Sequence, residues 1–135
     1  MKTGIAILVV SESSLQLSLT IAKHLPGSNL YSSFESIFTD TIPSIATFLK
    51  EHFNRFEAFV FVGSLGICVR SIAPFITDKH TDPAIVNIDS TGKYIISVLS
   101  GHIGGANSLT KQIARITGGQ AVITTQSDNT DLWAL

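Results

Sequence analysis

The sequence predicts an α/β fold in which a mostly parallel sheet lies between two layers of helices. Residues 4–10 and 58–62 are continuously apolar and rich in β-branched side chains, as is typical of strands covered on both faces of a parallel sheet. Amphipathic segments with helical spacing alternate with these strands. Residues 89–93 have the composition of a turn between two further apolar runs, so we expect one antiparallel hairpin in the sheet.

The first strand is expected to be followed by a helix. A serine at position 13 or 14 caps this helix, and the Pro-Gly pair at 26–27 ends it. Its predicted inward face is formed by Leu15, Leu19 and Ala22. A weaker strand signal covers residues 29–31.

A second helix is expected to open at Thr41 and Pro43, with an inward face formed by Ile45, Leu49 and Phe53. The strand at residues 58–62 comes next and runs directly into a glycine-containing turn. A short helix then covers about residues 67–73, and Pro74 ends it.

The second half of the chain contains the predicted hairpin, with strands at residues 84–88 and 94–99. A helix follows, and the glycine pair at 118–119 terminates it. The apolar face of this helix is formed by Ala106, Leu109, Ile113 and Ile116. A last short strand is expected at 121–123, and residues 128–131 have the composition of a cap for one more helix.

Composition narrows the class of protein. The 135 residues are 44% hydrophobic and 14% charged, with a formal net charge of −1, so a folded core is expected and a phosphate-neutralising nucleic-acid surface is not. Cys68 is the only cysteine, which rules out an internal disulfide and fits a reducing compartment. The apolar run at 4–10 is too short for a signal peptide or a membrane span. We therefore expect a soluble, cytoplasmic α/β domain over residues 1–135, cut from a longer multidomain protein.

The first candidate site follows the strand at residues 58–62. Glycines at a strand end let the backbone approach a ligand, and a helix that begins there favours an anion. Arg70 adds a fork-shaped donor for a carboxylate or phosphate. The alternative is a tight turn with an ordinary surface arginine. The candidate ligand-binding residues here are Gly63, Ser64, Gly66 and Arg70.

The second candidate site is the glycine-rich run between the hairpin and the last helix. Its glycines expose another helix start, and a histidine, the usual proton carrier near neutral pH, lies beside it. The alternative is a histidine satisfied within a structural turn. His102 is the candidate catalytic residue, and the candidate binding residues are Ser100, Gly101, Gly104, Gly105 and Asn107.

The third patch is the polar loop at residues 77–83, which contributes Lys79 and Asp82 to the candidate binding set. Such mixed-charge loops are usually just solvated. The alternation of Asp78, His80 and Asp82 is a weak metal signal, because no second Cys/His cluster completes it. The sequence has no serine-hydrolase elbow, dinucleotide fingerprint or Walker A run.

Read together, these stretches resemble the cobalamin-biosynthesis family CbiG. Residues 63–74 (GSLGICVRSIAP) are similar to its first conserved block, and residues 99–107 (LSGHIGGAN) to its most recognisable one. Asp78-Lys79, Asp82-Pro83-Ala84 and Ile123-Thr124-Thr125 fit further blocks in the same order. The resemblance runs from about Phe59 to Thr125, whereas the first fifty or so residues match only in pattern.

The resemblance implies the function of a cobalt-precorrin-5A hydrolase, which opens a lactone on a cobalt-containing tetrapyrrole and releases a two-carbon fragment as acetaldehyde. The substrate carries the cobalt, so no separate cofactor is implied. Family members continue into further domains, and a fused methyltransferase is a further candidate partner. The chain is similar to the N-terminal domain alone, which leaves the activity of this domain by itself open.

Within that resemblance, His102 is the candidate general base, and backbone N–H groups near Gly104 and Gly105 would hold an oxyanion or a carboxylate. Arg70 would clamp a peripheral carboxylate, and Asp82 would orient a histidine. The two glycine-rich runs are expected to face each other across one carboxylate-binding cleft. Two alternatives stay open: a non-catalytic tetrapyrrole-binding module, and a nucleotide- or phosphate-binding α/β domain.

Overall fold

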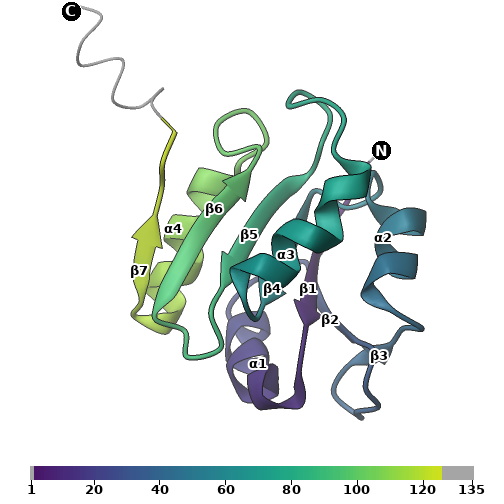
Figure 1. Cartoon of the computed structure of the whole chain (residues 1–135). Coiled ribbons are helices and arrows are strands. Elements are labelled where there is room, and N and C mark those ends of the chain that lie inside the picture. Colours follow the sequence, from purple (N-terminus) through teal and green to yellow (C-terminus); the bar gives the residue numbers. More distant parts are fainter. Residues whose placement is uncertain (1, 126–135) are drawn as a thin grey trace, which may run out of the picture.

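The computed structural model describes residues 2–125, which form one seven-stranded sheet with helices on both faces (Figure 1). The strand order is β3-β2-β1-β4-β5-β6-β7, and every neighbouring pair is parallel except β5 and β6. Strands β6 and β7 therefore run opposite to the other five. The strands are β1 (Ile5–Val9), β2 (Ser28–Ser32), β3 (Asp40–Thr41), β4 (Ala58–Val62), β5 (Ala84–Ile88), β6 (Tyr94–Leu99) and β7 (Gln120–Val122).

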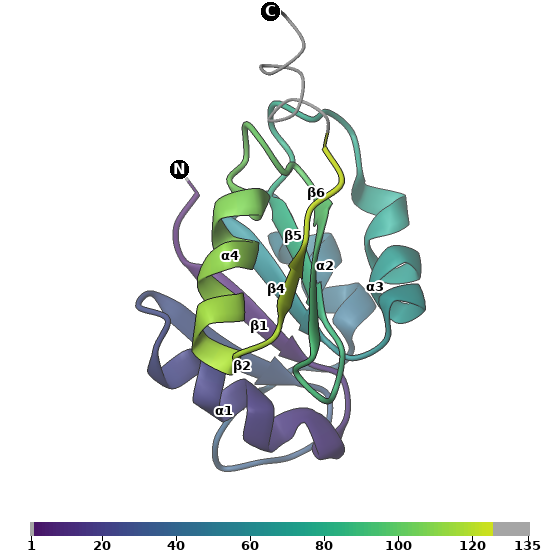
Figure 2. The same ribbon diagram turned by 90° about the vertical axis from the view of Figure 1, so that its left-hand side faces the viewer.

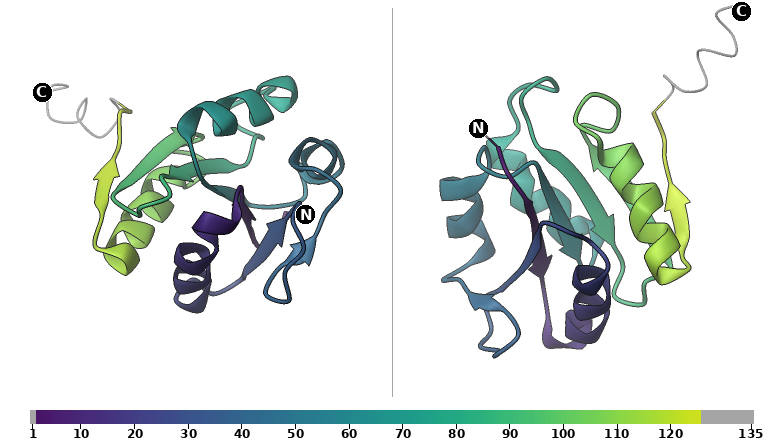
Figure 3. Two further views of the ribbon diagram at one scale, coloured as in Figure 1. Left: turned by 60° about the horizontal axis from the view of Figure 1, so that its bottom comes forward. Right: turned by 180° about the vertical axis from the view of Figure 1, so that it is seen from behind.

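Four α-helices make the outer layers, and the predicted three-layer α/β class is confirmed. One face of the sheet carries α1 and α4, and the other carries α2 and α3, as Figures 2 and 3 show from two further directions. The helices are α1 (Leu15–Lys23), α2 (Ile45–His52), α3 (Leu65–Ile72) and α4 (Ala106–Thr117). No helix within residues 2–125 is long and apolar enough to cross a membrane.

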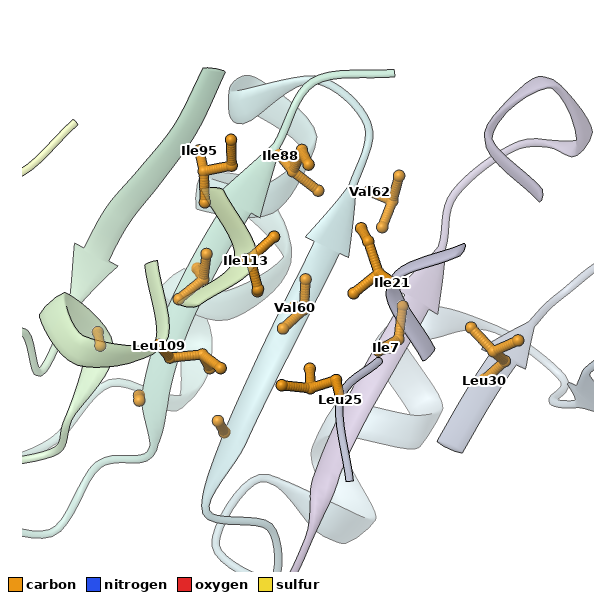
Figure 4. Packing of buried hydrophobic residues seen from close by; sticks show 14 of the residues in the cluster. Ile7, Ile21, Leu25, Leu30, Val60, Val62, Ile88, Ile95, Leu109 and Ile113 are labelled. Carbon is orange, nitrogen blue, oxygen red and sulfur yellow. The ribbon is translucent and has the colours of Figure 1, made fainter. Parts of the chain in front are cut away.

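Successive side chains of the central strands point to opposite faces of the sheet and pack in two separate hydrophobic cores. On one face, Ile7 and Val60 pack against Ile21 of α1 and Ile113 of α4 (Figure 4). On the other face, the inward residues of β4 join those of α2 and α3 in an aromatic-rich cluster, which includes Phe48, Phe59, Phe61 and Cys68. Because both faces are covered, β1 and β4 are apolar at every position and β5 at every position but Asn87, which is the pattern that predicted them.

The strongest strand predictions are confirmed. Strands β4, β5 and β6 have the predicted bounds, and the antiparallel register of β5 with β6 confirms the hairpin. The weak signal at 29–31 is the centre of β2. The last strand, β7, starts one residue earlier than expected.

The predicted inward residues of α1, Leu15, Leu19 and Ala22, do pack against the core, but they are only partly buried. The fully buried side chains of this helix are Ser18 and Ile21, which the prediction omitted. Ser18 is tolerated there because its Oγ donates to the Ser14 carbonyl at 2.7 Å. Ser14 holds the predicted cap position, but its side chain makes no capping hydrogen bond.

The predicted start of α2 is wrong. Thr41 belongs to the edge strand β3, and the helix begins at Ile45 after the N-cap Ser44, whose side chain accepts from Thr47 N at 3.0 Å. A two-residue strand carries too little sequence signal to be read from periodicity. Residues 128–131, predicted to cap a further helix, lie outside the described residues.

Helix α3 also starts earlier than predicted, at Leu65 rather than Ile67. Ser64 caps it by accepting from Ile67 N at 3.4 Å. The helix ends at Ile72, and Pro74 lies within a short 3₁₀ turn, Ala73–Phe75, that continues it. The glycine at position 66 lies inside the helix instead of in the loop before it.

Candidate functional site

Two loops meet at one end of the sheet and form a cavity. One loop, residues 76–83, connects α3 to β5; the other, residues 100–105, connects β6 to α4 (Figure 1). The cavity between them has a volume of about 380 Å³, within the range of small-ligand pockets. Its lining residues are Lys79, Ser100, Gly101, His102, Ile103 and Thr125. The structure thus brings together four of the predicted site residues.

Ser100 is the junction between the two loops. Its Oγ donates to the carbonyl of Asp82 at 3.1 Å, and its own carbonyl accepts from Ala106 N, the first residue of α4, at 3.2 Å. Its backbone has φ +59°, the only left-handed non-glycine residue among those described. This conformation is costly for a residue with a side chain, so these hydrogen bonds are what hold the corner of the cavity in place.

The glycines of the second loop are required by packing as well as by backbone angle. A Cβ at Gly101 would lie 2.6 Å from Asn107 Oδ1, and a Cβ at Gly104 would lie 2.5 Å from Ser100 Cβ and 2.8 Å from the Ser100 carbonyl. Gly105 has φ +89°, which favours glycine by itself. The glycine-rich signal therefore reports a tightly folded loop, and the exposed His102 lies on it.

The carboxylate of Asp82 stabilises the loop in which it lies. It was expected to orient a histidine, but its hydrogen bonds are to Thr77 and Asp78. Asp82 is only 4% exposed. Its carboxylate accepts from Thr77 N at 3.0 and 3.2 Å, from Thr77 Oγ1 at 3.0 Å, and from Asp78 N at 3.1 Å. Both oxygens are thus engaged in closing the 77–82 turn, which positions the neighbouring Lys79 at the cavity.

The side chain of Asn107 joins three segments by hydrogen bonds, and ligand binding by this residue stays a prediction. It is buried, its Oδ1 accepts from Ser97 Oγ at 2.7 Å, and its Nδ2 donates to Thr125 Oγ1 at 2.9 Å. These bonds tie β6, α4 and the segment after β7 to one another. The back wall of the cavity is fixed by this contact.

The sequence analysis expected free N–H groups at the N-termini of α3 and α4, but some of these groups form hydrogen bonds within the protein. In α4, the N–H groups of Ala106 and Asn107 donate to the carbonyls of Ser100 and Gly101 at 3.2 and 2.9 Å. In α3, the Ser64 side chain takes the N–H of Ile67. Both helix N-termini therefore offer fewer donors to an anion than the sequence suggested.

The expectation that the two glycine-rich runs face each other across one cleft is wrong. The first run follows the carboxyl end of β4, and the second follows the carboxyl end of β6, which runs in the opposite direction. The two runs therefore lie at opposite ends of the sheet. Arg70 is exposed in the last turn of α3 and is not among the cavity residues. Binding by Gly63, Ser64, Gly66 or Arg70 stays a prediction, separate from this cavity.

Among the described residues that line the cavity, Lys79 carries the one formal charge. Lys79 is exposed, and within residues 2–125 it forms no ion pair with a carboxylate. Ile103, an exposed side chain of the glycine loop, and Thr125 were missed as lining residues by the sequence reasoning. The sequence signal that would have identified Ile103 is a large apolar side chain within a run that otherwise consists of glycines and polar residues.

Two other chemistries have no support in the described structure. Cys68 is fully buried in the core, and burial raises the pKa of its thiol to about 12, so the thiol stays protonated near neutral pH. Among residues 2–125, no three His, Cys, Asp or Glu side chains are grouped in a way that would hold a metal ion. The weak signal of Asp78, His80 and Asp82 is therefore not realised as a metal site.

The fold and the cavity define an α/β domain with a small, mostly apolar cavity beside a polar loop that contributes Lys79. A family model described as "Cobalamin synthesis G N-terminal" matches residues 47–128, and the chain belongs to this family. The matched region contains both loops of the cavity. The resemblance found in the sequence is thereby confirmed.

Known proteins similar to this chain include two cobalt-precorrin-5A hydrolases. The protein from Salmonella typhimurium is 46% identical over 86 residues, which are 64% of this chain and 24% of that protein. The protein from Priestia megaterium is 49% identical over 85 residues, or 63% of this chain and 23% of that protein. The chain thus spans about a quarter of the length of these curated relatives.

A solved structure has the same fold. It is a cobalamin biosynthesis protein G homolog from Sulfolobus solfataricus, with a TM-score of 0.73 and 27% sequence identity. The alignment covers 90% of this chain and 36% of that one. The likeness therefore extends over the N-terminal strands and helices, where the sequence resemblance is limited to pattern.

Proposed function

We propose that this domain binds a cobalt-precorrin during cobalamin biosynthesis and takes part in the reaction of a cobalt-precorrin-5A hydrolase. The observation that carries the proposal is the position of the cavity within the matched region. Residues 47–128 include every lining residue, and the relatives that share this region at 46–49% identity bear that name.

The size and charge of the cavity suit the rim of such a substrate. A tetrapyrrole macrocycle is larger than a cavity of about 380 Å³, so only one edge of it fits. That edge carries carboxylates, and Lys79 is a suitable partner for one of them. Ile103 and the methyl group of Thr125 provide apolar contact for the adjoining carbon atoms.

The proposed reaction is hydrolysis of the lactone. A water oxygen forms a bond to the carbonyl carbon, the ring C–O bond breaks, and the water proton passes to the alkoxide that leaves. His102 is the general base in this step. The proposed oxyanion donors are the backbone N–H groups of Gly104 and Gly105, which belong to the same loop although they do not line the cavity itself. The cobalt belongs to the substrate.

The test is the substitution His102→Ala in a chimera in which this chain replaces the corresponding region of the Priestia megaterium relative. Loss of a general base should lower kcat by about a hundredfold or more. His80→Ala is the matched control, because His80 is an exposed histidine on the adjacent loop and does not line the cavity. Equal turnover of H102A and the unmodified protein, measured as acetaldehyde release, would remove His102 from this role.

A non-catalytic binding module is the second candidate. It is favoured by the share of the relatives that the chain spans, about a quarter. On this proposal, the 135-residue chain binds a cobalt-precorrin, as seen by a change in the corrin absorbance, and releases no acetaldehyde. Acetaldehyde release by the 135-residue chain alone would refute it in favour of a complete active site.

A further inference from the structure

Among residues 2–125, helices cover both faces of the sheet only as far as β5. Helix α4 packs on one face of β5, β6 and β7, whereas on the other face α3 packs on β5. In Figure 1 no helix lies in front of β6 and β7, and Figure 2 shows α4 against one side of these strands only. We call the uncovered surface of β6 and β7 the open face.

The side chains of the open face follow from strand alternation and register. Ile95 and Ser97 are buried on the α4 side, so Tyr94, Ile96 and Val98 point to the other side. The parallel register pairs Tyr94 with Gln120 and Ile96 with Val122, and paired residues share a face. The open face therefore consists of Tyr94, Ile96, Val98, Gln120 and Val122.

This face is apolar and uncharged, yet it is only partly buried. Ile96, Val98 and Val122 are half-buried, and Tyr94 is 43% exposed. Val98 contacts the edge of the aromatic-rich core, whereas Ile96 and Val122 belong to neither core cluster of the described residues. At its border lies one charge, Lys93, whose Nζ is 5.3 Å from the Tyr94 ring centroid. Side chains of this kind in a mixed sheet are normally covered by a second layer.

We propose that the open face packs against the polypeptide that follows the matched region in the longer relatives. The relatives are about four times as long as the part that matches here. Strand β7 is the last described element and forms half of the open face, so polypeptide that continues from it starts beside this surface. The occupant presents an apolar surface to Ile96 and Val122, with a carboxylate opposite Lys93.

The experiment compares the 135-residue chain with a chimera in which this chain replaces the corresponding region of the Priestia megaterium relative. Hydroxyl-radical footprinting measures how accessible each side chain is. Oxidation of Ile96, Val98 and Val122 should fall about fivefold or more in the chimera, because the centre of an interface excludes water. Ile37, which is 93% exposed in the loop between β2 and β3, should be oxidised equally in both proteins.

A substitution links the protection to this face. In the chimera, Ile96→Lys should restore oxidation of Val98 and Val122, whereas Ile37→Lys, the matched control, should not. Circular dichroism checks the fold, and Val122→Lys at the edge strand replaces I96K if that variant unfolds. Equal oxidation of the open face in the chain and the chimera overturns the proposal. Protection of the open face that appears in the 135-residue chain by itself and rises with its concentration also overturns the proposal, because the occupant would then be a second copy of the chain.

Discussion

Two glycine-containing turns look alike in the sequence and differ in the structure. Residues 63–66 and residues 100–105 both join a strand to a helix. The first turn is a simple strand-to-helix turn with a serine cap, and Gly66 lies inside the helix. The second is a packed loop with a strained serine, a cavity and a histidine. A glycine-rich run therefore shows that backbone must pass closely, but not what the loop is for.

The hairpin explains why these turns are separated. Strands β4 and β6 run in opposite directions because β5 and β6 are antiparallel. The cavity consequently lies at the carboxyl ends of β6 and β7 and at the amino ends of β1, β4 and β5. In parallel α/β sheets, ligands usually bind at the carboxyl ends of the strands. Here the cavity lies at the carboxyl ends of β6 and β7 only, and these two strands run opposite to the other five.

The largest expected difference between the two turns is in stability. Gly104→Ala places a Cβ against Ser100 and should lower the free energy of unfolding by about 2 kcal/mol, as overpacking does. Gly66→Ala meets nothing within 4 Å and should raise the free energy of unfolding by about 0.5 kcal/mol, because alanine is favoured in a helix. Urea denaturation measures both. Similar changes in the free energy of unfolding for G104A and G66A would contradict the proposed difference between the two turns.

The second difference concerns affinity for the cobalt-precorrin. Lys79→Ala should weaken binding about tenfold, which corresponds to the loss of one charge-assisted contact of about 1.4 kcal/mol. Arg70→Ala should leave affinity unchanged if the cavity alone holds the substrate. Titration followed by corrin absorbance gives both constants. A tenfold loss with R70A and none with K79A would move the binding site to the other turn.

The third prediction concerns the cap of the first turn. Ser64→Ala removes the acceptor of the Ile67 N–H and should lower the free energy of unfolding by about 1 kcal/mol. The same substitution should not affect substrate affinity, because Ser64 lies at the far end of the sheet from the cavity. Ser64→Asp is the matched control, since it retains a capping acceptor. A loss of affinity in S64A at unchanged stability would show that this turn binds the substrate.

The smallest effect is expected in the hairpin that separates the two turns. Burial of Asp89 opposes its ionisation, but hydrogen bonds from Thr91 and from the backbone of residues 93–94 outweigh it and lower the pKa of the carboxyl. A lowered pKa stabilises the fold above the unfolded-state value and this contribution is lost as the pH falls through the folded-state value. Asp89→Asn should therefore flatten the acid side of the stability curve measured by denaturation from pH 5 downward. An unchanged slope would contradict this role.

The accuracy of sequence reasoning differed from element to element for physical reasons. The bounds of β4 were predictable, because a strand buried on both faces is apolar throughout. Those of β5 and β6 were predictable because the turn residues 89–93 separate two apolar runs. The fully buried side chains of α1 were not, since Ser18 satisfies its hydroxyl on its own helix and can therefore lie in the core between leucines that are only partly buried. Strand β3 is too short to show a period.

For the candidate site, the sequence identified residue types correctly but not their grouping. His102, Lys79, Ser100 and Gly101 were each singled out, and they line one cavity. Asp82 and Asn107 were also singled out, yet their side chains hold the loops in place. The same types of polar side chain position loops and contact ligands, so a sequence does not distinguish the two roles. Only their hydrogen-bond partners tell them apart.

The sequence by itself determined the α/β class, the hairpin and the family, because these depend on local apolar pattern and on motif order along the chain. The tertiary structure alone decided which loops meet. The hairpin was predictable, but the parallel pairing of β4 with β5 joins segments distant in the sequence, and the two pairings together put the glycine loop beside residues 76–83 instead of residues 63–66. The location of the site therefore depends on a long-range pairing that no local pattern encodes.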